Sequence, residues 1–161
     1  VDQLSGTRLT FDLKETIEHV LHSLSHEFKR KRVQIVFKCE KSIVIDSYPG
    51  SYSQVLTNLV MNSLIHGFEN KSEGQIEILA VEVGDNIEIH YRDNGVGMTS
   101  ELLEKVWQPY FTTKRDKGGS GLGMQIIYNI VVRTLKGQVQ LTSQPDQGVY
   151  CLISVPKALQ N

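Results

Sequence analysis

Hydrophobic side chains in the first third of the chain follow two different periods. From Asp12 to about Arg30 they recur at helical spacing and form one face, made of Ile17, Val20, Leu21, Leu24 and Phe28. This pattern predicts a helix, which Asp12 is expected to cap after the short strand "GTRLTFDL". The next two segments, "VQIVFKC" and "SIVIDSY", are typical of strands, and we expect them to pair with each other.

The rest of the chain alternates between helix-like and strand-like patterns. Helices are predicted from Ser51 to His66, ended by Gly67, from Ser100 to Val106, and in "LGMQIIYNIVVRTLKG". Hairpins are predicted in "GQIEILAVEVGDNIEIHYRD", with its turn at residues 84–86, and in "GQVQLTSQPDQGVYCLISVP".

Strands and helices are mixed without regular βαβ alternation, which predicts an α+β fold. We expect an α/β sandwich, in which a mixed, mostly antiparallel sheet of about five strands is covered on one face by three helices. With 161 residues and no repeat or linker, the chain is expected to form one domain over residues 1–161.

Charge and composition exclude several classes of function. Seventeen Lys and Arg balance eighteen Asp and Glu, which argues against nucleic acid or a membrane surface as the main partner. No apolar run approaches the roughly 20 residues of a membrane span, and the N-terminus lacks a signal-peptide layout. Cys39 and Cys151 have no CxxC spacing, so we expect reduced thiols and a cytoplasmic domain without direct membrane contact.

A polar stripe runs along the predicted second helix, because Gln54, Asn58, Asn62 and His66 recur every four residues. The stripe flanks the apolar face of the helix, where an unpaired amide costs about 1–3 kcal/mol. Two interpretations follow. The amides bridge neighbouring loops, or an Asn carbonyl oxygen binds a hard cation such as Mg²⁺.

The string "RDNGVGM" places a carboxylate at a strand end, followed by two glycines. Asp93 only accepts hydrogen bonds when ionised, so it is suited to the exocyclic amine of adenine and repels the carbonyl of guanine. Gly95 and Gly97 allow the backbone to approach a flat ligand closely. The same string is also typical of a simple turn.

Two further stretches, "VWQPYFTTK" and "GGSGLGM", are suited to phosphate. Glycines at the start of a helix present backbone N–H groups, although a Gly-rich linker has the same composition. Lys114, Arg115 and Lys117 lie between the two stretches and supply three cations. Neither the Walker pattern nor the dinucleotide pattern GxGxxG is present.

In this order, the four stretches resemble the N, G1, F and G2 boxes of the catalytic and ATP-binding domain of sensor histidine kinases. That domain belongs to the GHKL superfamily, shared with gyrase, mismatch-repair ATPases and heat-shock chaperones. The resemblance extends from "TFDL" to "ISVP" and implies the Bergerat ATP-binding fold.

The resemblance implies a role for each matching residue. It makes Asn62 the Mg²⁺ ligand, Asp93 the reader of adenine, and residues 110–117 a lid. The implied nucleotide-binding residues are Asn58, Asn62, His66, Asp93, Gly95, Gly97, Tyr110, Phe111, Thr112, Thr113, Lys114, Gly119, Ser120, Gly121, Leu122, Gly123 and Met124. Ile65 stands where relatives often carry Lys or Arg, so Lys114 or Arg115 is expected to supply that charge.

The implied function is a kinase that uses ATP and Mg²⁺. ATP-hydrolysing members generally place Glu at the position of Asn58, and asparagine cannot act as a general base. We therefore expect Asn58, Lys114 and Arg115 to support γ-phosphoryl transfer to a histidine on a separate dimerisation/phosphoacceptor domain, followed by a response regulator. The alternatives are an ATPase that cycles between conformations and a nucleotide-dependent docking module.

His26, in "LSHEFKRKRV", stands in a string typical of the histidine that a sensor kinase phosphorylates. It projects about 180° from the apolar face of its helix, and His19 and His22 lie within roughly 40° of it. Because a strand follows and no second long helix accompanies it, we expect His26 to be a solvent-exposed histidine and not the phosphate acceptor. The three histidines have a spacing that allows a metal ion, but plain solvent exposure is the favoured interpretation.

Overall fold

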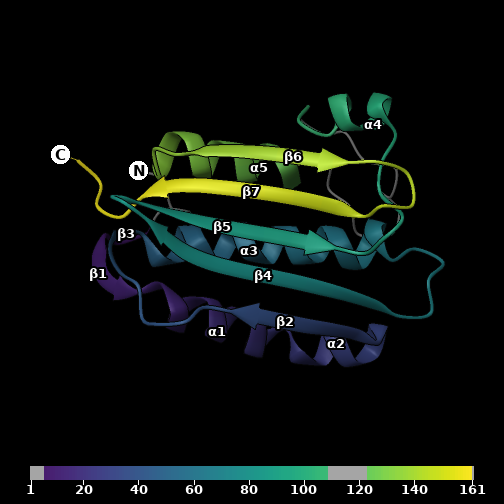
Figure 1. Ribbon diagram of the computed structural model, residues 1–161, viewed down its shortest axis with the longest axis horizontal. Coiled ribbons are helices and arrows are strands. Elements are labelled where there is room, and N and C mark those ends of the chain that lie inside the picture. Colours follow the sequence, from purple (N-terminus) through teal and green to yellow (C-terminus); the bar gives the residue numbers. More distant parts are fainter. Residues whose placement is uncertain (1–5, 109–122, 161) are drawn as a thin grey trace.

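The computed structural model describes residues 6–108 and 123–160 (Figure 1). Its elements, in chain order, are β1 (Leu9–Asp12), α1 (Leu13–Ser23), α2 (Ser25–Lys31), β2 (Val33–Lys38), β3 (Val44–Ser47), α3 (Pro49–Asn62), the π-helical turn η1 (Ser63–Gly67), β4 (Gly74–Val83), β5 (Asn86–Asp93), α4 (Ser100–Lys105), α5 (Gly123–Tyr128), the π-helical turn η3 (Asn129–Thr134), β6 (Gln138–Ser143) and β7 (Val149–Pro156).

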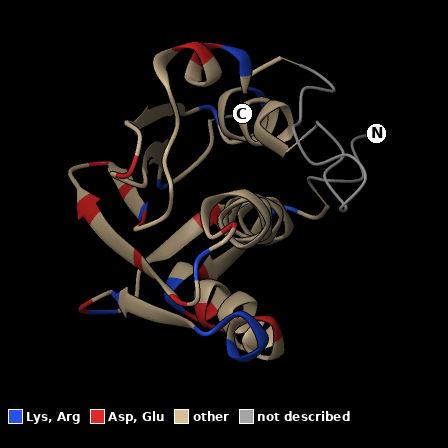
Figure 2. Ribbon diagram, turned by 90° about the vertical axis from the view of Figure 1, so that its right-hand side faces the viewer, with Lys and Arg blue, Asp and Glu red and all other residues tan. Residues whose placement is uncertain are grey.

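The main sheet has five strands in the order β2-β4-β5-β7-β6. The pair β2–β4 is parallel and the other three pairs are antiparallel. Figure 1 shows α1, α3 and α5 behind this sheet, and Figure 2 shows the same two layers edge-on. The predicted sandwich, with a mixed and mostly antiparallel sheet covered on one face by three helices, is confirmed.

Strand alternation explains why the helices gather on one face. Up to Ala80 in β4 and throughout β5, every second residue is buried, whereas the residues between them are more exposed. The inward residues are Ile76, Ile78, Ala80, Ile87, Ile89 and Tyr91, and α3 meets them with Val55, Leu56, Leu59 and Val60. Because burying each large apolar side chain contributes about 1.5–3 kcal/mol, this layer fixes α3 above the middle of the sheet.

The predicted pairing of "VQIVFKC" with "SIVIDSY" is wrong. Strand β2 pairs with β4, and β3 pairs antiparallel with β1 in a separate two-stranded sheet. The side chain of Asp12 explains the position of β3, because its Oδ1 accepts a hydrogen bond from the backbone N–H of Ile43 at 3.1 Å. The N–H of Leu13 donates to the carbonyl of Ile43 at 2.8 Å, so the start of β3 is held beside the end of β1.

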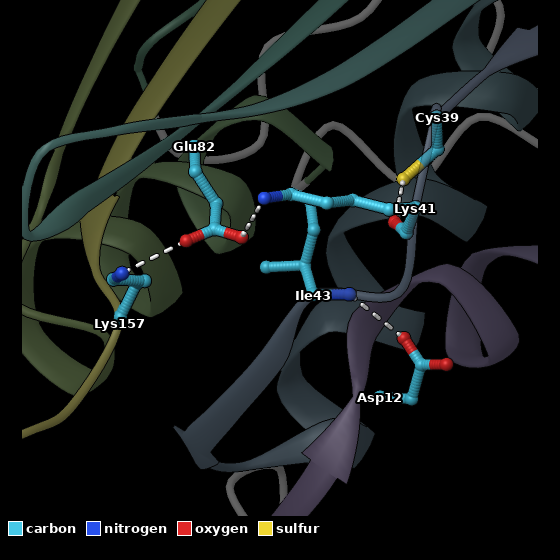
Figure 3. Close-up of polar contacts among 6 residues, drawn as sticks. All are labelled: Asp12, Cys39, Lys41, Ile43, Glu82 and Lys157. Carbon is cyan, nitrogen blue, oxygen red and sulfur yellow. Dashed lines mark hydrogen bonds and ion pairs between the residues drawn. The ribbon is translucent and has the colours of Figure 1, made fainter.

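Polar contacts also fix the loop between β2 and β3 (Figure 3). Lys41 Nζ lies 3.8 Å from Glu82 Oε1 at the end of β4, and Lys157 Nζ lies 2.8 Å from Glu82 Oε2. Within the loop, the thiol of Cys39 donates to the carbonyl of Lys41 at 3.2 Å. The loop thus contacts the main sheet through an exposed ion pair, and the strand that follows it pairs with β1.

The two ends of the described chain meet on the small β1–β3 sheet. Arg8 binds the carboxylate of Asp46 through two nitrogens, each 2.9 Å from an oxygen, and also donates to the carbonyl of Leu159. Asp46 further forms an isolated parallel bridge with Ala158. A two-pronged Arg–carboxylate pair defines geometry more strictly than a single contact does.

The predicted first helix is divided in two. Helix α1 ends at Ser23, Leu24 leaves helical geometry with φ −99° and ψ 7°, and α2 begins at Ser25. His19, His22 and His26 are exposed, as predicted. No cluster of three or more His, Cys, Asp or Glu side chains suited to a metal ion occurs among residues 6–108 and 123–160.

Acidic and basic residues are interspersed over the described surface, and basic residues gather at the end of α2 (Figure 2). This distribution agrees with the balanced composition. In the part of the chain that the structure describes, no helix is long and apolar enough to cross a lipid bilayer.

Candidate functional site

Helix α3 carries the predicted amide side chains. Asn58 and Asn62 lie one turn apart and are half-buried. The Nδ2 atom of Asn58 is buried, and none of the described residues accepts a hydrogen bond from it. Since an unpaired buried donor costs about 1–3 kcal/mol, this nitrogen is suited to an acceptor supplied by a ligand.

The start of α5 packs directly on Asn62. The Nδ2 atom of Asn62 donates to the sulfur of Met124 at 3.4 Å. A Cβ atom at Gly123 would lie only 3.1 Å from Oδ1 of Asn62, so this position favours glycine. Three predicted residues therefore meet where α3 and α5 touch, and the donor bond to sulfur leaves the amide oxygen as the acceptor of Asn62.

Asp93 stands at the end of β5 and is only 4 % exposed. Its Oδ1 accepts from the backbone N–H groups of Gly95 at 3.0 Å and Val149 at 3.1 Å. Its Oδ2 accepts from the hydroxyl of Ser63 at 2.6 Å. Three donors from three segments thus hold this carboxylate in one orientation, beside the end of α3.

The glycines after Asp93 are required by close backbone packing. A Cβ at Gly95 would lie 2.3 Å from the carbonyl oxygen of Gly67. Gly97 has φ +69°, and a Cβ there would lie 2.0 Å from the carbonyl oxygen of Gln144. These glycines therefore bring the segment after β5 against η1 and the β6–β7 loop, in addition to any contact with a ligand.

His66 lies in η1, where the helix changes from α to π geometry. The N–H of Phe68 donates to the carbonyl of Ser63 at 2.9 Å, a five-residue step. The α-helical part of the polar stripe therefore ends at Asn62, and His66 lies in the π-helical turn. His66 and Ile65 are both half-buried.

Several predicted site residues lie outside the described part of the chain. They are Tyr110, Phe111, Thr112, Thr113, Lys114, Arg115, Gly119, Ser120, Gly121 and Leu122. Their assignments remain predictions from the sequence.

Sequence reasoning missed two residues of this site, Ser63 and Tyr91. The Ser63 hydroxyl contacts Asp93 and also the phenol of Tyr91, whose oxygen is 2.6 Å away. Strand alternation already placed Tyr91 on the same face as Asp93 and was a usable signal. Ser63 follows Leu59 and Val60 at helical spacing on the buried face, which was also a usable signal.

Comparison with known proteins identifies the family. Residues 48–159 match the family described as histidine kinase-, DNA gyrase B- and HSP90-like ATPase. The chain belongs to this family. The matched residues contain all four stretches singled out in the sequence.

Relatives within the family are sensor histidine kinases. The sensor histidine kinase ZraS of Klebsiella oxytoca is 33 % identical over 147 residues, which cover 90 % of this chain and 30 % of that protein. The sensor protein DegM of Bacillus sp. (strain B21-2) is 31 % identical over 157 residues, covering 96 % of this chain and 40 % of DegM. The chain thus spans less than half the length of these relatives.

Solved structures agree with this assignment. The catalytic domain of the histidine kinase ThkA, in a nucleotide-free form, has a TM-score of 0.82 and 25 % identity, covering 94 % of this chain and 97 % of that one. Full-length ShkA in complex with AMPPNP has a TM-score of 0.81 at 18 % identity, covering 96 % of this chain and 32 % of that one, and shares the fold.

Proposed function

We propose that this chain binds Mg-ATP and donates the γ-phosphoryl group to a histidine on a separate dimerisation/phosphoacceptor domain, in two-component signal transduction. In this proposal residues 1–161 form one catalytic and ATP-binding domain, and the acceptor histidine lies elsewhere. The observation that carries the proposal is the buried Asp93 carboxylate, held by three donors beside the Asn58–Asn62 face of α3.

The carboxylate of Asp93 is suited to adenine. Its two oxygens offer about four acceptor positions, and three described donors use three of them. The remaining position on Oδ2 accepts one further N–H, such as that of the exocyclic amine of adenine. Guanine carries a carbonyl oxygen at the same position, so two hydrogen-bond acceptors, that oxygen and Oδ2 of Asp93, would face each other.

The residues present fit Mg²⁺ held jointly by protein and triphosphate. Asn62 offers one amide oxygen, because its Nδ2 is bonded to Met124. Mg²⁺ usually keeps several waters and takes one or two protein ligands together with phosphate oxygens, so a single amide oxygen suffices. When bound, Mg²⁺ neutralises charge on the transferring phosphoryl group.

This chain's own residues contribute positioning. Asn58 presents Nδ2, which has no partner among the described residues, as a donor, and its amide cannot take a proton from water. That chemistry favours a kinase, which spares the γ-phosphate until a histidine arrives, over an ATPase. Lys114 and Arg115 are proposed to add positive charge at the transferred group. His66, Gly95, Gly97, Gly123 and residues 110–113, 119–122 and 124 are proposed to line the nucleotide.

The proposed partners follow from the relatives. One solved histidine kinase, ThkA, is described in complex with the response regulator TrrA. We extend this to a phosphoacceptor domain and a response regulator for this chain, with no nucleic acid involved. A cytoplasmic location is part of the proposal, because the phosphoryl donor is ATP.

Calorimetric titration of the purified chain tests the proposal. We expect saturable binding of a non-hydrolysable ATP analogue, strengthened by Mg²⁺, and no competition by GTP. Mixing the chain with ATP and a separately prepared phosphoacceptor domain should then label a histidine of that domain. Absence of adenine nucleotide binding would favour the docking-module alternative, and sustained ATP hydrolysis without an acceptor would favour the ATPase alternative.

A further inference from the structure

A buried chain of hydrogen bonds leads from α3 to Asp93. The phenol of Tyr91 donates to the carbonyl of Leu59 at 3.1 Å and lies 2.6 Å from Oγ of Ser63. The Ser63 hydroxyl in turn donates to Oδ2 of Asp93 at 2.6 Å. Tyr91, Ser63 and Asp93 are 1 %, 3 % and 4 % exposed, so these bonds are shielded from water.

The direction of each bond follows from the groups at the two ends. The carbonyl of Leu59 only accepts, and an ionised carboxylate at Asp93 only accepts. Ser63 must therefore give its single proton to Asp93, and Tyr91 must share its proton between Ser63 and Leu59. Burial raises the pKa of Tyr91 well above its ordinary value, so the phenol keeps that proton. The Ser63 proton therefore points toward Asp93, and the Tyr91 proton is available to Ser63 and Leu59.

Ser63 lies on the buried face of α3, because its backbone is still α-helical and its N–H donates to the carbonyl of Leu59. Asn62 and Ser63 are consecutive, yet the side chain of Asn62 contacts α5 and that of Ser63 contacts β5. Gly67 closes the π-helical turn η1, and a Cβ there would lie 3.1 Å from Oδ2 of Asp93. One short segment therefore serves both ends of the proposed nucleotide, the phosphates through Asn62 and the base through Ser63.

We propose that Ser63 and Tyr91 are positioning residues that hold Asp93 as a pure acceptor and so set the preference for a 6-amino purine over a 6-oxo purine. This inference rests on the proposed function, because it assigns Asp93 to the base. Without the Ser63 hydroxyl, Oδ2 loses the donor that fixes its rotation, and the carboxylate is free to turn away from the exocyclic group. Without the Tyr91 hydroxyl, Ser63 loses the donor that sets its own orientation.

The test compares ADP with IDP, which differ at position 6 and at the adjoining ring nitrogen. Calorimetry on the purified chain gives both dissociation constants for the wild type and for Ser63→Ala, Tyr91→Phe and the double variant. We expect Ser63→Ala to weaken ADP binding about tenfold, with a smaller effect on IDP, so that the ADP preference falls. Tyr91→Phe should act in the same direction. Because the two residues act in series, the double variant should lose no more than Ser63→Ala alone.

A matched control separates positioning from general damage to the fold. Ser51 is a fully buried serine in the first turn of α3, remote in sequence from Ser63, and Ser51→Ala should leave the ADP to IDP ratio unchanged. If Ser63→Ala keeps the wild-type ratio, or if the losses in the double variant simply add, the inference is wrong.

The outcomes also separate this inference from the proposed function. A wild type that binds neither nucleotide contradicts the proposed function, and the inference falls with it. A wild type that prefers ADP, with Ser63→Ala showing the same preference, contradicts only the role of Ser63 and Tyr91. In an Asp93→Asn background, Ser63→Ala should no longer alter the ratio; a persisting effect would show that Ser63 acts by another route.

Discussion

Replacing Asp93 with asparagine changes one atom and tests the proposed reading of adenine. In the structure, Oδ1 of Asp93 faces two backbone donors, from Gly95 and Val149, whereas Oδ2 faces the hydroxyl of Ser63. An asparagine is expected to keep its oxygen toward the two N–H groups. Its Nδ2 then occupies the position of Oδ2, so a donor meets the exocyclic amine of adenine where an acceptor stood before.

The size of the effect follows from that geometry. A buried hydrogen bond is lost and a donor is left facing a donor, which costs about 1–3 kcal/mol. At 1.4 kcal/mol for each factor of ten, ADP binding should weaken by about 5- to 150-fold. IDP carries an oxygen at position 6, so its affinity should rise relative to that of ADP. The preference between the two nucleotides should shrink or reverse.

Calorimetric titration with ADP and IDP measures both effects, and thermal denaturation followed by circular dichroism checks that the variant is folded. Asp146→Asn is the matched control, because Asp146 is exposed and its φ of 64° suits asparagine equally well. The reasoning is refuted if folded Asp93→Asn binds ADP as tightly as Asp146→Asn does.

Three further predictions concern other parts of the molecule. Asn62→Ala should weaken Mg²⁺-dependent ATP binding more than metal-free ADP binding; equal losses in calorimetry would place the metal elsewhere. Burial acts to raise the pKa of Asp12, but hydrogen bonds from one hydroxyl and two backbone N–H groups outweigh it and hold that pKa below its ordinary value. The stability from Asp12 is therefore present above the ordinary carboxyl pKa and is lost as pH falls through the lowered one. Between about pH 5 and pH 1 the melting temperature of the wild type should fall more steeply than that of Asp12→Asn, and parallel curves would contradict this. Burial raises the pKa of the Cys151 thiol to about 12, so iodoacetamide at about pH 8 should label Cys151 only after unfolding; mass spectrometry showing labelling in the folded chain would contradict this.

Much of the main sheet was predictable because its signals are local. The alternation in residues 74–93 and the turn between β4 and β5 specify a hairpin without reference to the rest of the chain. The position of β3 was not predictable in this way. A short loop between two strand-like segments favours a hairpin, but the contacts of Asp12 with residues 42 and 43 bring β3 to β1.

The sequence motifs predicted where some residues of the candidate site lie, but they did not predict the contacts that form when the elements pack. The spacing of Asn58 and Asn62 on one helix, and the position of Asp93 at a strand end, could be read from the sequence. The contact between Ser63 and Asp93 could not, because it depends on how α3 packs on β5. The π-helical turn after α3 was likewise not predicted, because a periodicity of four residues does not distinguish it from an α-helix.

The junction of the two chain ends at Arg8, Asp46 and Leu159 has a consequence for how such a domain is carried within a longer polypeptide. Domains whose termini lie close together tolerate insertion into another chain, since the host sequence needs to part by only a short distance. Here entry and exit share one small ribbon, at a distance from Asp93 in the fold. A force applied by a flanking segment at either end therefore acts on the same small sheet of β1 and β3.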